Sequence, residues 1–218
     1  MPTLISMRAG SCRRAFVPET VEILEAATVP VLSLAEARKH VKQEAWMGGD
    51  PAKPGVMGHP DDDEIMMAVA AATGEIEAPN GWLGRAIMPQ TLMVRLERLE
   101  PIRIPAPPLL EIVSVNVEGE GGGWTFMAED QWNVAGDGPH AVLEPARGVT
   151  WPSGRANVTF RAGYEPPAGA ALINPELAAI KAWVKLRTHD LYVTGGTLSK
   201  MGEAPFAAHL LTNLRVRT

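Results

Sequence analysis

The sequence predicts an α+β protein, a small helical bundle of about three helices with an inserted antiparallel β-sandwich or barrel-like region and an extended C-terminal tail. Three observations predict this architecture. Apolar residues recur at helical spacing in two segments before residue 80. They alternate with polar residues in short segments between residues 90 and 162, and Asn174 opens one long helix. A chain of 218 residues is long enough to bury such a core.

The composition limits the classes of function. The formal net charge of −5 argues against a protein that coats nucleic acid, because phosphate binding needs dense Lys and Arg. The one cysteine, Cys12, has no second cysteine for an internal disulfide. No run of about 18 uncharged apolar residues occurs, so a membrane-spanning helix is not expected. Residues 1–30 contain basic side chains without the apolar core of a secretory signal, and they predict an irregular N-terminal arm.

The first helix is predicted to begin at Ser33 and to end near Trp46. Ser33 and Glu36 have the spacing of a capping box, in which each side chain satisfies a backbone donor of the other residue. The apolar stripe from Leu34 to Val41 is thin. This helix must therefore dock on a larger element.

A Gly- and Pro-rich loop over residues 48–60 precedes the second helix. The four acids Asp61 to Glu64 admit a metal site, but an EF-hand loop needs alternating ligands, a central Gly and a distant Glu. We therefore interpret Asp61 as the N-cap and the other acids as complements of the helix dipole. Pro79-Asn80-Gly81 ends this helix. One helical face carries Ile65, Val69, Ala72 and Ile76.

From Gln90 the apolar period changes to two, which indicates strands with one buried face. The first strand alternates Leu92, Val94 and Leu96 with more polar residues. The run from Gly119 to Trp124 resembles a phosphate-binding loop but lacks the Gly-Lys-Ser/Thr ending, so a hairpin turn is favoured. The further predicted strands are Ile102–Ile104, Ile112–Val117, Glu129–Val134, Ala141–Leu143 and Asn157–Ala162.

The last helix begins at Asn174, with Pro175 at its first position, and ends before Gly195-Gly196. Its apolar stripe contains Leu177, Ile180, Trp183, Val184 and Leu191, whereas Lys181, Lys185 and Arg187 are predicted to face solvent. The tail that follows either folds back on the core or binds a partner. Its apolar and basic side chains are Phe206, Leu210, Leu211, Leu214, Arg215 and Arg217.

No segment carries a catalytic signature. The five histidines lack the short spacing of a metal site, and Ser11-Cys12 has no nearby base in the sequence. We predict no enzyme activity, no metal and no cofactor. Four aromatic residues, Trp124, Trp132, Trp151 and Tyr164, admit a sugar-binding platform, although core packing is favoured.

Five segments, in this order, resemble the head-tail connector (adaptor) proteins of long-tailed phages and phage-like gene transfer agents. The likeness covers about residues 31 to 195. The matching segments are 33–42, 61–65, 84–92, 102–109 with 112–115, and 161–164 followed by the helix at 180–183.

The resemblance implies a structural virion protein. Copies would form a homo-oligomeric ring of twelve beneath the portal, assembled in the host cytoplasm, and would extend the DNA channel towards the stopper and tail. The partners would be the portal protein, the stopper or tail-side connector, and double-stranded DNA passing without sequence specificity, with no membrane. The acidic net charge suits a channel that must not grip phosphates.

The resemblance also divides the chain into functional parts. Residues 31–89 and 166–200 would form the helical connector body, and 90–165 the β-rich insertion. Residues 201–218 would form the partner-binding tail, with the six tail residues named above contacting the portal. The alternative is a carbohydrate-binding or tail-fibre-like β module of a virion.

Overall fold

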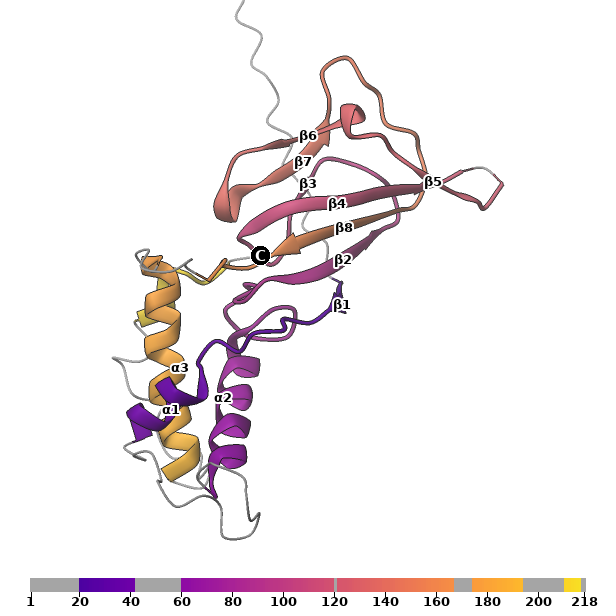
Figure 1. The fold of residues 1–218 in the computed structure, drawn as a ribbon. Helices are drawn as coiled ribbons and strands as arrows, with labels where there is room; N and C mark the ends of the chain where they lie inside the picture. The colour runs from indigo at the N-terminus through magenta and orange to yellow at the C-terminus, as the bar shows by residue number, and fades with distance from the viewer. Residues whose placement is uncertain (1–19, 42–59, 120, 167–173, 194–209, 217–218) are drawn as a thin grey trace, which may run out of the picture.

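The computed structural model describes residues 20–41, 60–119, 121–166, 174–193 and 210–216. Helices gather at one end of the molecule and strands at the other (Figure 1). The fold is α+β, as the sequence predicts. The helices are α1 (Leu34–Val41), α2 (Asp62–Ile76) and α3 (Pro175–Val193).

Two of the three predicted helix starts are confirmed in detail. In α1 the Ser33 amide donates to Glu36 Oε2 at 2.9 Å, and the Glu36 amide donates to Ser33 Oγ at 3.2 Å. These reciprocal bonds are the capping box. In α3 the Glu176 amide donates to Asn174 Oδ1 at 2.8 Å. Local spacing alone therefore located both starts.

The predicted side-chain cap of α2 is wrong. Asp61 occupies the N-cap position, but its side chain makes no capping hydrogen bond. Its Oδ2 instead accepts from Tyr192 Oη at 2.6 Å, while Asp62 forms an ion pair with Arg38. Both carboxylates connect α2 to another helix, because α3 and α1 bring a phenol and a guanidinium within reach. The acids therefore join helices as well as lying at the positive end of the helix dipole.

The strands form two antiparallel sheets. A five-stranded sheet has the order β1-β2-β8-β4-β5, and a three-stranded sheet has the order β3-β7-β6. The strands are β1 (Val21–Glu25), β2 (Gln90–Leu96), β3 (Ile102–Arg103), β4 (Leu109–Glu118), β5 (Trp124–Phe126), β6 (Trp132–Ala135), β7 (Val142–Pro145) and β8 (Ala156–Ala162).

Two sequence predictions for the strands need correction. Residues 129–131 form a short 3-10 helix rather than the start of a strand, and the strand begins at Trp132. Residues 21–25 form β1, although an irregular arm was predicted there. β1 is an edge strand with mostly exposed side chains, so no buried face imposes an alternating pattern on its sequence.

The hydrophobic core has two clusters. The first joins the three helices to Leu83, Ile87, Tyr164 and Leu211. The second lies between the sheets, where the inward residues of β2, β4 and β8 meet Ile102 and Leu143. The strands β2 to β8 lie between α2 and α3 in the sequence. The chain thus leaves the helical body after α2 and returns to it at α3.

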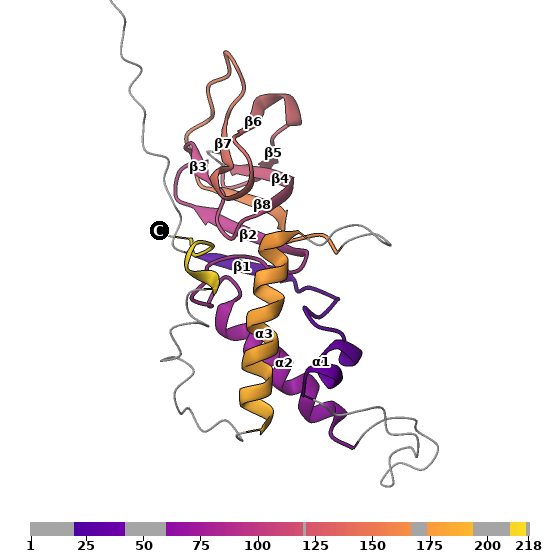
Figure 2. The same ribbon diagram turned by 90° about the vertical axis from the view of Figure 1, so that its left-hand side faces the viewer.

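The three helices lie side by side in both ribbon views (Figures 1 and 2). α2 runs towards the sheets and α3 runs away from them, so the two long helices are antiparallel (Figure 1). No helix in the described part of the chain combines the length and apolar character needed to cross a membrane.

Replacing Gly74 with Ala should raise the free energy of unfolding. An added Cβ at Gly74 has no atom within 4 Å, and glycine in a helix costs about 0.5 to 1 kcal/mol relative to alanine. Urea denaturation of G74A should show this gain. The contrasting variant G81A should be strongly destabilised, because its Cβ would lie 2.1 Å from the carbonyl carbon of Ile76.

Candidate functional site

The candidate partner-binding tail lies against the helical body where the structure describes it. Leu211 is fully buried in the helical core, and Leu210 and Leu214 pack partly against that core. Arg215 is exposed. Phe206 and Arg217, the remaining two predicted contact residues, lie outside the described residues. The described segment therefore both anchors to its own chain and presents a basic side chain.

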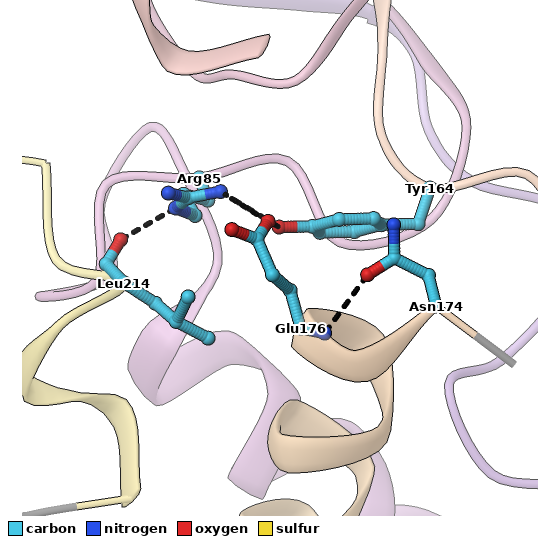
Figure 3. A network of polar contacts seen from close by, with 5 residues as sticks. All are labelled: Arg85, Tyr164, Asn174, Glu176 and Leu214. Atoms are coloured by element: carbon cyan, nitrogen blue, oxygen red, sulfur yellow. Dashed lines mark hydrogen bonds and ion pairs between the residues drawn. The ribbon is translucent and has the colours of Figure 1, made fainter.

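A buried arginine connects this tail to the rest of the protein (Figure 3). Arg85 is 4% exposed and donates through Nε to the Leu214 carbonyl oxygen at 2.5 Å. A second nitrogen of the same guanidinium, Nη1, donates to Tyr164 Oη at 2.7 Å and to Glu176 Oε2 at 3.0 Å. Tyr164 Oη in turn donates to Glu176 Oε2 at 2.5 Å. One guanidinium thus holds the end of β8, the start of α3 and the tail.

Local backbone geometry brings Arg85 into this position. The Ala78 amide donates to the Arg85 carbonyl at 2.8 Å, and Gly84 has a positive φ of 69° that few other residues adopt readily. The Val216 amide donates to the Leu83 carbonyl at 3.0 Å. A Cβ on Gly84 would lie 3.3 Å from Val216 Cβ. Glycine at this position therefore allows both the turn and the close approach of the tail.

The network holds Tyr164 in its neutral form. Burial raises the pKa of the Tyr164 hydroxyl well above its ordinary value, and the hydrogen bond to Glu176 raises it further, whereas Arg85 opposes the shift. The phenol consequently keeps its proton and donates it to the carboxylate. Asn174 fixes the Glu176 backbone by accepting its amide (Figure 3).

A second carboxylate holds the segment that carries Arg85. Glu77 Oε1 accepts the Ile87 amide at 3.1 Å and Gln90 Nε2 at 3.3 Å. Burial raises the pKa of Glu77, and the backbone donors Ile87 and Met88 oppose that shift. The chain between α2 and β2 is therefore fixed at both of its ends.

Arg187 is buried, which corrects the prediction that it faces solvent. It forms ion pairs with Glu75 Oε1 at 2.7 Å and Asp190 Oδ2 at 2.7 Å. Helical periodicity places Arg187 at the edge of the apolar stripe. A residue at that position is buried only if another element covers it, and here α2 does so with Glu75. The sequence contained Glu75, but its distance of 112 residues along the chain hid the pairing.

The aromatic residues proposed for sugar binding do not share one surface. Trp124 is 49% exposed on the edge strand β5, whereas Trp132 and Trp151 pack against the core between the sheets. Tyr164 belongs to the helical cluster. The four rings therefore form no common platform.

The titratable side chains assemble no candidate metal centre in the part of the chain that is described. No group of three or more His, Cys, Asp or Glu is positioned there to hold a metal ion. His40 and His189, distant in sequence, form an edge-to-face ring contact with centroids 6.0 Å apart. Neither histidine was predicted to meet the other, because α1 and α3 come together only in the folded chain.

No protein-family model matches this chain, and no curated protein sequence matches it. Solved structures do match. A chain from the neck of an empty GTA particle computed with C6 symmetry aligns at a TM-score of 0.66 and 21% identity, covering 91% of this chain and 97% of that one. A chain from the virion of a native gene transfer agent (GTA) particle aligns at 0.64 and 20% identity, covering 91% and 96%.

A chain from the neck of a native GTA particle computed with C12 symmetry aligns at a TM-score of 0.59 and 20% identity, covering 91% of this chain and 97% of that one. The fold is shared with these neck chains over nearly their whole length. This agrees with the head-tail connector family that the sequence motifs resemble.

Replacing Arg85 with Ala should lower the free energy of unfolding by about 3 kcal/mol, because a buried tyrosine, a carboxylate and a carbonyl lose their shared donor. Y164F removes one hydroxyl and should cost about 1 kcal/mol. Hydrogen exchange provides a specific readout, since the Val216 amide should lose protection in R85A but keep it in Y164F. Equal exchange in both variants would contradict the coupling of Arg85 to the tail.

Acidification should weaken the contact between α1 and α3. Burial, followed by the nearby charges of His189 and Lys185, lowers the pKa of His40 below its ordinary value of 6.5. The unfolded chain binds a proton on His40 more tightly than the folded chain does. The free energy of unfolding is therefore highest above the ordinary pKa of His40, and it decreases as the pH falls to the lower pKa of the folded state. Melting temperatures from about pH 8 to about pH 5 should fall less steeply in H40Q than in the parent protein.

Proposed function

We propose that this chain is a head-tail connector (adaptor) protein that forms a ring beneath the portal of a phage-like particle. The ring extends the DNA channel and joins the DNA-filled head to the stopper and tail. The observation that carries this proposal is the fold shared with GTA neck chains over 91% of this chain. The role is structural rather than catalytic.

Twelve copies are proposed for the ring. The related neck structures were computed with C6 and C12 symmetry. A twelve-fold ring also contains six-fold symmetry, so both descriptions are compatible with twelve subunits. Such a ring needs heterologous contacts, in which two different faces of each subunit meet. The net charge of −5 favours passage of double-stranded DNA over retention, because few excess cations are available to hold phosphates.

The tail is proposed as the contact to the portal, and its residues have two different roles. Leu211 and the carbonyl of Leu214 attach the tail to its own subunit. Phe206, Arg215 and Arg217 supply the apolar and basic groups for the portal, together with the exposed parts of Leu210 and Leu214. Because Leu211 and Leu214 are already held in the subunit, less conformational entropy is lost when the tail binds the portal.

Reversing two tail charges should separate portal binding from folding. R215E/R217E should weaken binding to purified portal rings by about tenfold or more. The proposed attraction between these two arginines and acidic groups of the portal becomes repulsion when both are glutamates. Electron microscopy of the parent protein mixed with portal should show a stacked ring. Surface plasmon resonance with immobilised portal rings gives the affinity of the parent protein and of the variant.

The matched control is R98E/R147E, which makes the same change in net charge at two exposed arginines of the β region. It should bind portal like the parent protein. Unchanged binding of R215E/R217E would refute the tail contact, and failure of the parent protein to form any ring with portal would refute the connector function.

A further inference from the structure

Both long helices leave an apolar face uncovered in the single subunit. On α2, Met67 is 65% exposed, and the small residues Ala70 and Gly74 are exposed beside it. On α3, Val193 is 57% exposed and follows the exposed Ala182. Exposed apolar residues that lie together on a surface mark interaction sites. These faces are therefore candidates for contact with a partner.

The α2 face borders an apolar groove. The groove has a volume of about 250 Å³ and runs between α2 and the segment of residues 27–31. Val29, which is 50% exposed, lies on one side, and Met66, Ala70 and Gly74 lie on the other. A Cβ added at Gly74 would meet no atom within 4 Å. The groove thus has room for side chains from another molecule.

The two uncovered faces carry opposite charges at corresponding ends. Asp63 and Glu64 are exposed at the start of α2. In the second half of α3 the half-buried Lys185 supplies the positive charge, and the exposed His189 beside it contacts His40 of α1. Because α2 and α3 are antiparallel, both charged ends lie at the end of the helical body away from the sheets (Figure 1). An acidic end of one face can therefore meet a basic end of the other.

We propose that the α2 face and groove of one copy bind the exposed α3 face of the next copy in the ring. This inference rests on the proposed connector function. The two faces belong to different helices of the subunit, α2 with its groove and α3 with Ala182 and Val193. Two different faces make a heterologous contact, the type that closes into a ring.

The register of this contact follows from symmetry. Rotation about an axis parallel to the helices keeps every residue at its height. Two contacts set the relative height of α2 and α3: Tyr192 bonds to Asp61, and Arg187 bonds to Glu75. Both helices rise about 1.5 Å per residue, so Ala182 lies level with the last part of α2, near Gly74. By the same count Met67 lies level with the last turns of α3. Small residues then face small residues, which allows the helices to approach closely.

A bulky side chain in the groove should block ring formation without unfolding the subunit. G74L should keep or raise the melting temperature, because leucine is a better helix former and no atom lies within 4 Å of a Cβ at this position. Electron microscopy of G74L mixed with portal should show no rings of the variant. G121L is the matched control, since Gly121 also has no atom within 4 Å of an added Cβ and lies in the β4–β5 turn. It should assemble like the parent protein.

Cross-linking tests the pairing itself. In a C12S background, A70C and A182C should each give no cross-linked product alone with a short bismaleimide. A mixture of the two single variants should give dimers, and the double variant A70C/A182C should give a ladder of higher oligomers. This pattern is specific to a heterologous contact, because each face then meets only the other.

The outcomes separate this inference from the proposed function. Rings that form with G74L, or that contain no α2–α3 cross-link, overturn the inference and leave the connector function intact. Self cross-linking of A70C also overturns it, because that product requires an isologous contact. A parent protein that forms no ring at any concentration or with portal overturns both.

Discussion

The buried guanidinium of Arg85 is the interaction on which the helical body and the tail depend together. Removing a charge from water is costly unless it is paired and hydrogen-bonded, and here Tyr164, Glu176 and the Leu214 carbonyl satisfy it. Each partner belongs to a different part of the chain. The charge therefore enforces their convergence, since displacement of any one partner leaves a buried donor unsatisfied.

This arrangement explains how a β region can be inserted into a helical body without loosening it. The chain leaves α2 through a segment held by Glu77 and Arg85, and it returns through Tyr164 to α3. Both crossings meet at the same polar network (Figure 3). Movement of the β region as a unit must therefore strain contacts that also hold the helices and the tail.

Both ends of the molecule mix charged and apolar side chains on their surfaces. The large sheet carries ion pairs between neighbouring strands, such as Arg95 with Glu22 at 2.7 Å and Arg161 with Glu111 at 2.7 Å. Exposed pairs of this kind add little stability. The same sheet exposes Phe126, whereas α2 exposes Met67.

The sequence by itself determined the elements whose signals are local. The capping box of Ser33 and Glu36, the Asn174 start and the alternation in β2 and β8 all act over a few residues, so spacing sufficed to predict them. Only the tertiary structure decided which charges are buried. Arg85 and Arg187 find carboxylates about a hundred residues away, and Asp61 binds Tyr192 instead of capping its helix. Such pairings depend on which elements pack together, and no local pattern encodes that distance.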